Sequence, residues 1–152
     1  MESRSFIRFE IGFYRLKRRL LQEFLRPYDL KAFDSMLLVT VVMHPGCSQG
    51  AIIQHVMADE TSIARGLRNL EEKRLITRQE DPTNHRKKLV QPTAKAQEIF
   101  DKFDSLLELW NEFIFKDFTS QELDSLEKMI AKMQTNLKDI DYQELLTKFK
   151  KE

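Results

Sequence analysis

Residues 59–90 constrain this chain more than any other part, because a helix pattern is followed directly by a hairpin pattern. Residues placed about 100° apart, as in an α-helix, bring the apolar side chains onto one face. These are Ile63, Leu67 and Leu70, and the opposite face carries Thr61, Ser62, Arg65, Arg68 and Asn69. The pattern predicts a short helix that packs on a core with one side and presents guanidinium, hydroxyl and amide groups with the other.

The hairpin pattern consists of strand-forming residues at 75–78 and 88–90 around a turn-forming segment at 81–86. The second strand begins with a basic run, Arg86-Lys87-Lys88. A helix followed by a two-stranded wing with a basic tip is typical of a winged helix-turn-helix, in which the helix enters the major groove and the wing reaches phosphates or the minor groove. The alternative is an αββ fragment whose charged face is only solvated.

Composition supports one ordinary globular domain. The chain has 152 residues, of which 41% are hydrophobic and 32% charged. We expect a single domain over residues 1–152, mainly α with a small two-stranded β wing. Its one cysteine excludes an intramolecular disulfide framework and a Cys-based zinc cluster. No signal peptide and no membrane span is recognisable, so we expect a cytoplasmic protein.

Charge is unevenly distributed, although the formal net charge is only +1. Residues 62–91 contain eight Lys and Arg against four Asp and Glu, whereas residues 96–146 contain twelve acids against five bases. A basic middle beside an acidic C-terminal region indicates one lobe that faces a polyanion and another region held away from it.

Helical periodicity predicts the elements before the polar-faced helix. We expect a first helix over residues 6–25, ended by Pro27, and a second over residues 29–43 with Asp29 as its N-cap. Ser48 is the expected N-cap of a third, short helix. Asp59 caps the polar-faced helix, so these two helices form a helix-turn-helix. The resulting DNA-binding lobe covers residues 29–92.

The C-terminal part is predicted to form three helices: one over residues 93–117, one that starts at a capping box of Thr119 and Glu122, and one over residues 142–150. Their apolar stripes, with that of the first helix, exceed what one small winged lobe can bury. Residues 1–28 and 93–152 are therefore expected to form a dimerisation region. For the basic residues of the first helix, Arg15, Lys17, Arg18 and Arg19, we favour a solvated or packing role over contact with DNA or a partner helix.

This order of elements resembles the MarR family of winged helix-turn-helix transcription regulators. The resemblance covers most of the chain and is strongest at residues 48–93, in TSIARGLRNLEEKRLI and DPTNHRKKLVQPT. It implies a homodimer that binds a palindromic operator on double-stranded DNA, and many members repress their targets. Two positions depart from the family pattern. Arg74 stands where a glycine is usual, and Asn84 stands where an acid is usual, which puts the wing's internal salt bridge to Arg86 in doubt.

Candidate site residues follow from these patterns. The predicted DNA contacts are Ser48, Gln49, Thr61, Ser62, Arg65, Arg68, Asn69, Arg86 and Lys87. The resemblance also implies a cleft for a small aromatic or phenolic acid effector. Its candidate lining is Phe13, Tyr14, Phe33 and Met36, with a plain core role as the alternative for each.

Enzymatic chemistry is not indicated. The three histidines are scattered without metal-ligand spacing, and no glycine-rich phosphate loop is present, so we expect neither catalytic residues nor a cofactor nor a metal. The competing functional class is a winged-helix protein–protein module that uses the same helix face without binding DNA. Cys47, with no adjacent cation, is expected to be a structural or incidental thiol.

Overall fold

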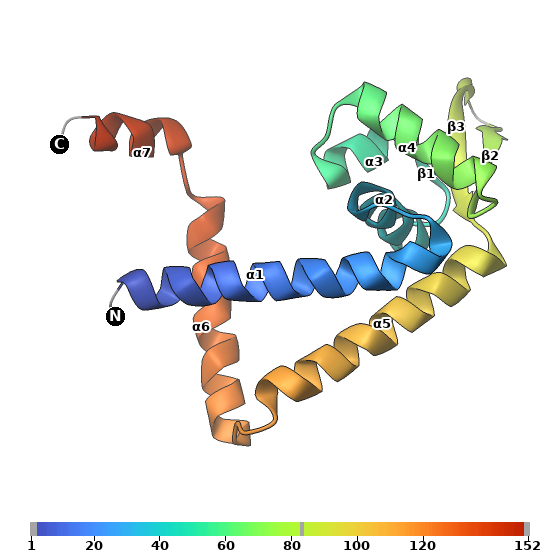
Figure 1. The fold of residues 1–152 in the computed structure, drawn as a ribbon. Coiled ribbons are helices and arrows are strands. Elements are labelled where there is room, and N and C mark those ends of the chain that lie inside the picture. Colours follow the sequence, from blue (N-terminus) through green and yellow to red (C-terminus); the bar gives the residue numbers. More distant parts are fainter. Residues whose placement is uncertain (1–2, 83, 151–152) are drawn as a thin grey trace. The chain divides into compact units, whose positions relative to one another are not determined.

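The computed structural model describes residues 3–82 and 84–150, with the backbone alone for Ser3, His85, Arg86 and Lys87. It divides into two compact units, residues 1–106 and 107–152. Their elements are, in chain order, α1 (Ser3–Leu25), the 3-10 turn η1 (Arg26–Tyr28), α2 (Ala32–Met43), β1 (Cys47–Ser48), α3 (Gln49–Val56), α4 (Glu60–Glu72), β2 (Ile76–Asp81), β3 (Asn84–Pro92), α5 (Ala94–Phe115), α6 (Ser120–Lys138) and α7 (Tyr142–Phe149) (Figure 1). The mainly helical class with a small β wing is confirmed.

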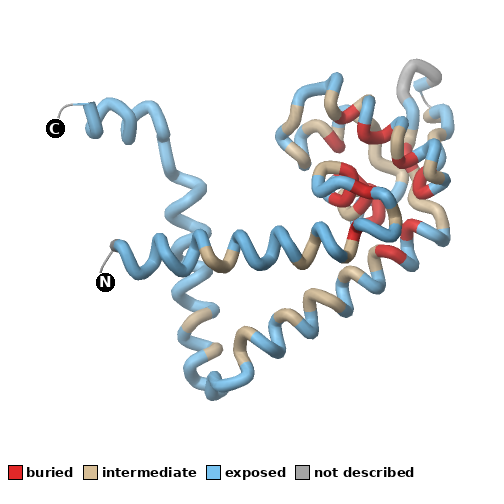
Figure 2. The backbone as a smooth tube through the Cα atoms, in the orientation of Figure 1, coloured by how far each residue is buried: buried red, intermediate tan, exposed pale blue. Residues whose placement is uncertain are grey.

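The core of the first unit lies among α2, α3, α4 and the sheet, where the buried residues gather in Figure 2. Ile63, Leu67 and Leu70 on α4 are completely buried, as their spacing predicts. They pack with α2 residues such as Leu37 and Val41, which are equally inaccessible. One side of α4 is therefore fixed in the core, so its other side is held in a defined position.

The sheet has three antiparallel strands in the order β1-β3-β2, one more than predicted. β2 and β3 form the expected hairpin, with Arg78 opposite Val90, and a register shift falls between Glu80 and Asp81. The additional strand is Cys47–Ser48, which pairs with the other edge of β3. A strand of two residues has no alternation to read, so sequence periodicity could not reveal it.

Three predicted helix caps are confirmed. The side chain of Ser48 accepts a hydrogen bond from the Ala51 N–H, and that of Asp59 accepts from the Ser62 N–H at 2.8 Å. The Thr119 hydroxyl and the Glu122 carboxylate cap the start of α6 reciprocally, as a capping box should.

The predicted cap at Asp29 is wrong. α2 begins three residues later, and Asp29 ends the 3-10 turn in the left-handed region with φ at 50°. Its carboxylate accepts a hydrogen bond from Lys73 Nζ at 2.6 Å, and this bond lowers the pKa of Asp29. The first turn of α2 is closed instead by Asp34, whose carboxylate accepts from the Lys31 N–H at 3.0 Å. Asp29 is therefore the C-cap of the 3-10 turn rather than the N-cap of α2, and its carboxylate pairs with a residue 44 positions away.

The hydroxyl of Thr93 joins α5 to the loop that follows α4. Its oxygen lies 2.9 Å from the carbonyl oxygen of Arg74 and 3.1 Å from that of Leu75. The same oxygen accepts a hydrogen bond from the Ala96 N–H in the first turn of α5. One side chain therefore ties the end of the helix-turn-helix to the beginning of the long helix.

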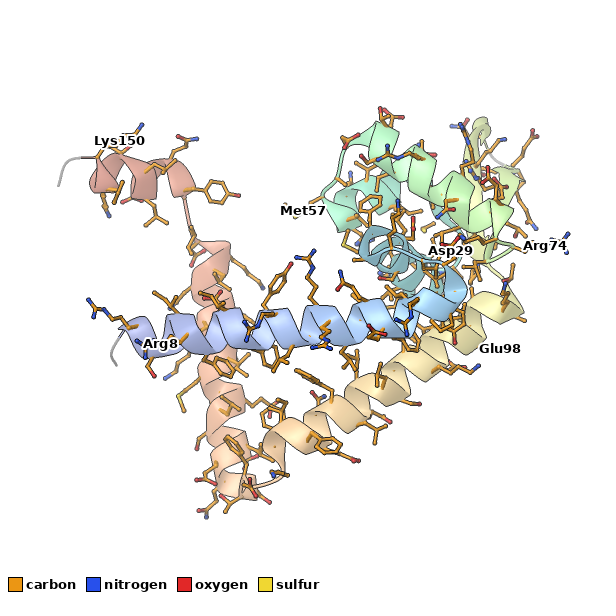
Figure 3. All side chains as sticks on the ribbon, in the orientation of Figure 1. Arg8, Asp29, Met57, Arg74, Glu98 and Lys150 are labelled. Atoms are coloured by element: carbon orange, nitrogen blue, oxygen red, sulfur yellow. The ribbon has the colours of Figure 1, made fainter. Side chains whose placement is uncertain are left out.

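Arg74, labelled in Figure 3, has a φ of 58°, in the region that favours glycine. We expect Arg74→Gly to raise the free energy of unfolding by about 1 kcal/mol, because a Cβ in this conformation is strained. Urea denaturation measures the change. Arg74→Ala is the control, since it removes the same side chain but keeps the Cβ. Equal stability of the two variants would show that the backbone at this position is not strained.

The second unit exposes many apolar side chains. On the helices they are Leu109 and Phe113 of α5, Met129, Ile130, Met133 and Leu137 of α6, and Tyr142, Leu145, Leu146 and Phe149 of α7, and Phe118 and Ile140 lie between the helices. Monomeric proteins rarely expose so many apolar side chains close together, so these residues indicate an interaction surface. Among the described helices, none combines the length and the apolar character needed to cross a membrane.

Candidate nucleic-acid interface

The outer face of α4 presents two arginines to solvent. Arg65 and Arg68 are exposed, as is Thr61 near the start of the helix. Neither guanidinium forms an ion pair with a residue that the structure describes. The helix begins at Asp59, whose pKa is lowered by the hydrogen bond from the Ser62 N–H, so its cap is ionised at neutral pH. Two unpaired guanidiniums on a helix anchored from behind are suited to base edges or phosphates.

Ser62 and Asn69 lie on the flank of α4 rather than at the centre of its outer face. Both are half-buried, and with Arg65 they line a hollow of about 760 Å³. The opposite wall comes from the start of α2 and the residues before it: Asp29, Lys31, Phe33 and Asp34. Of the five polar residues predicted on one face, Thr61 and Arg68 point outward, Ser62 and Asn69 lie at the hollow, and the exposed Arg65 borders it.

A second hollow of about 690 Å³ lies at the N-terminus of α3. Ser48 and Gln49 line it as predicted DNA contacts, although the Ser48 hydroxyl is engaged as the cap of α3. Gln54 on α3 and Lys88 on β3 line it as well, and Glu60 stands at the start of α4. Sequence reasoning did not place Gln54 and Lys88 at the site. For Lys88, its place in the basic run Arg86-Lys87-Lys88 could have indicated a role at the site.

Two of the described basic side chains in residues 62–91 form ion pairs within the fold. Lys73 binds Asp29, and Arg78 on β2 binds Glu71 on α4 at 2.9 Å. The Arg78 side chain is only 19% exposed, and its Nε is buried without a hydrogen-bond partner in the described part of the chain. Arg78 therefore holds the sheet against α4. The positive surface is smaller than the count of bases suggests, because these two charges are compensated.

The wing residues Arg86 and Lys87 lie on β3 by their backbone, and their side chains lie outside the described residues. Asn84, at the first position of β3, is opposite Asp81 in the strand register. The predicted roles of Arg86 and Lys87 in DNA binding stay predictions.

Of the four candidate effector residues, Phe33 lines the hollow beside α4. Met36, on the same helix, is 42% exposed. Tyr14 on α1 is 67% exposed, and the half-buried ring of Phe13 lies 5.5 Å from that of Phe9. Only Phe33 is therefore placed beside a predicted DNA contact, Arg65, at the same hollow.

The Cys47 thiol is expected to have no oxidant-sensing role. Burial raises its pKa, so the reactive thiolate is scarcer than in a free cysteine. We expect peroxide treatment to leave DNA affinity unchanged in a gel-shift titration. Cys47→Ser is the matched control. A peroxide-induced loss of affinity that disappears in this variant would contradict the expectation.

Comparison with known proteins gives consistent matches. Residues 28–87 match the model of the MarR family. The structure is similar to the crystal structure of MarR, with 26% identity, a TM-score of 0.70 and coverage of 88% of this chain and 98% of that one. It is also similar to the transcriptional regulator SlyA, with 25% identity, a TM-score of 0.72 and coverage of 88% and 94%. A MepR–DNA complex from S. aureus shares the fold at 21% identity and a TM-score of 0.66, over 85% of this chain and 96% of that one.

Proposed function

Because this chain belongs to the MarR family of transcription regulators, we propose that it is a sequence-specific DNA-binding repressor of transcription and that it is located in the cytoplasm. It binds a palindromic operator as a homodimer and is released by a small-molecule effector. The observation that carries the proposal is the exposed position of Arg65 and Arg68, neither of which is ion-paired with a described residue, on a helix whose other face is buried. The MepR protein, which shares this fold, was solved in complex with DNA.

In the proposed complex, α4 lies in the major groove. Arg65, near the middle of the outer face, makes a bidentate contact to guanine, and Thr61 and Arg68 contact neighbouring groups. The hollow at the N-terminus of α3 receives the phosphate backbone, with Gln49 and Lys88 as donors. Arg86 and Lys87 of the wing reach phosphates or the minor groove. Ser62 and Asn69, at the flank of α4, have a smaller part in contacting bases.

The proposed dimer is formed by residues 1–28 and 93–152, with residues 29–92 as the DNA-binding lobe. Its support is the exposed apolar face of α1, including Phe9 and Ile11, and the exposed apolar residues of α6 and α7. A two-fold dimer presents two copies of α4, which matches a palindrome with half-sites about 10 bp apart.

Removal of the residues after Asp139 should weaken the dimer. The truncation deletes α7 with its exposed Leu145, Leu146 and Phe149, and it lowers DNA affinity by loss of bivalent binding. Light scattering measures the mass, and a gel shift measures affinity. A truncation after Phe149, which keeps α7, is the control. A full-length chain that is monomeric at micromolar concentration would contradict the proposed dimer.

The proposed effector is a small aromatic or phenolic acid. Phe33 supplies an aromatic wall, and Lys31 and Arg65 supply cations at the hollow beside α4. An acid bound there would engage a guanidinium that DNA also needs, so binding of one would weaken binding of the other. Millimolar salicylate should reduce DNA affinity, and Phe33→Ala should reduce the effect. Unchanged affinity and melting temperature across a panel of such acids would count against the effector.

The decisive experiment is recovery of genomic fragments bound by the purified protein, followed by a gel shift with the recovered sequence and a scrambled version. The proposal expects at least tenfold preference for the recovered sequence, which Arg65→Ala removes. If no fragment is enriched, the alternative class, a winged-helix protein–protein module without DNA binding, becomes the better description.

A further inference from the structure

α1 has a stripe of four arginines along one side, which we name the α1 arginine stripe: Arg4, Arg8, Arg15 and Arg19. With residues placed 100° apart, the four fall within an arc of about 60°. All four are exposed. The acidic residues of this helix, Glu10 and Glu23, lie outside the arc by the same geometry. The stripe therefore consists of two arginine pairs, Arg4 with Arg8 and Arg15 with Arg19, on one side of the helix, with the apolar Ile11 between the pairs and no acidic side chain within the arc.

The sequence favoured a solvated or packing role for Arg15 and Arg19, but packing within the fold uses neither side chain. None of the four arginines forms an ion pair with a described residue, whereas Arg26, just beyond the helix, pairs with Glu23 at 2.9 Å. Phe9, Phe13 and Phe24 are on the opposite side of the helix by the same geometry, so packing does not use these arginines. Arg4 and Arg8 also stand in the first two turns, where the helix dipole disfavours a positive charge.

We propose that the α1 arginine stripe binds the phosphate backbone of DNA outside the segment that α4 reads. Arginine suits this task because its planar guanidinium donates two parallel hydrogen bonds to a phosphate. At a rise of 1.5 Å per residue, the stripe extends over about 22 Å, a length that corresponds to roughly six base pairs of duplex. This inference rests on the proposed function, because it concerns the same DNA.

Charge complementarity requires an anionic occupant, and DNA is favoured among such occupants because the same unit carries the proposed DNA-binding helix α4. The chain has a second candidate for phosphate contact at the N-terminus of α3, and both belong to the first unit. A second copy of the acidic C-terminal unit and an anionic membrane surface are the competing partners. Both are outcomes that the experiment distinguishes.

The test uses the full chain with Arg8, Arg15 and Arg19 changed together to Gln. The matched control changes Lys128, Lys132 and Lys138 on α6 to Gln, which removes the same number of exposed charges. Binding to mixed-sequence duplexes of about 20 and about 40 bp is measured over a salt series, because each phosphate that the protein no longer neutralises lowers the slope of log K against log salt by about 0.9. Circular dichroism and light scattering monitor helix content and mass.

For the stripe variant we expect a slope on the longer duplex that is smaller by about two to three units, and a smaller change on the shorter one. Between 50 and 200 mM salt, wild-type affinity should then fall about 40-fold more than that of the variant. The Lys control should keep the wild-type slope. We also expect the stripe variant to keep the helix content and the dimer mass of the wild-type protein.

Equal slopes for the stripe variant and the Lys control would overturn the inference. So would loss of the dimer in the stripe variant, which would assign the stripe to a second copy. Wild-type binding to phosphatidylserine vesicles that the stripe variant loses, with unchanged DNA slopes, would assign it to a membrane. A wild-type protein that binds neither duplex would refute the proposed function itself, whereas a wild-type protein that binds both, with an unaltered stripe variant, refutes the stripe alone.

Discussion

Arg65→Ala is expected to cost about 1–3 kcal/mol of binding free energy per half-site and to abolish preference at one or two base positions. The side chain stands on the outer face of α4, and no described carboxylate competes for it. Its removal would delete the proposed bidentate contact from each copy of the helix in the proposed dimer. Gel shifts with the recovered operator and with a scrambled duplex measure the effect, and the operator should lose much more affinity than the scrambled DNA.

Arg86→Ala is the contrasting variant, since the wing is expected to bind through charge and groove shape. It should weaken binding to operator and scrambled DNA more evenly, and it should lower the salt slope by about one unit for each phosphate that Arg86 neutralises in the wild type. Arg65→Lys is a further control, because it keeps the charge but not the bidentate geometry. Equal losses on both DNAs for Arg65→Ala, with an operator-specific loss for Arg86→Ala, would reverse the two assignments.

Gly66→Val should destabilise the fold by about 3 kcal/mol, because there is no room for a side chain between α4 and α2. A Cβ at Gly66 would overlap Leu37 Cδ1 and lie 3.2 Å from Phe33 Cε1. Leu37 is completely buried, so it cannot move aside without disturbing the core. Urea denaturation gives the difference in free energy of unfolding.

Gly12 provides the matched control for this prediction. It also lies within a helix, but a Cβ there meets no atom within 4 Å. Gly12→Ala should therefore stabilise the chain by about 1 kcal/mol through helix propensity, whereas Gly66→Ala should not. If both alanine variants gain stability equally, the packing of α2 on α4 is looser than the structure indicates.

The local signals in the sequence were sufficient for most of the helices. The α4 stripe of Ile63, Leu67 and Leu70 is buried as its period requires, and the caps at Ser48, Asp59 and Thr119 follow from chemistry within three residues. Such features are set by neighbours along the chain, which is why a single sequence reveals them.

The errors came from contacts between distant residues. Asp29 is a residue type that often caps helices, but here it ends the 3-10 turn and α2 begins after Lys31, and no local pattern predicts its pairing with Lys73. Lys73 and Arg78 contribute to the positive charge counted in residues 62–91, but in the structure they form ion pairs with Asp29 and Glu71. Within the candidate site, the periodicity placed Ser62 and Asn69 on the outer face, but it could not show that α2 closes a hollow beside them.

The attachment of Thr93 has a mechanical consequence. Its hydroxyl contacts the loop after α4 and also accepts a hydrogen bond from the first turn of α5, so the end of α4 and the start of α5 are coupled through one side chain. α5 runs from Ala94 to Phe115, so a movement of this helix would displace its first turn and, through Thr93, the loop after α4. Thr93 is thus the side chain through which a movement of α5 would reach the loop after α4.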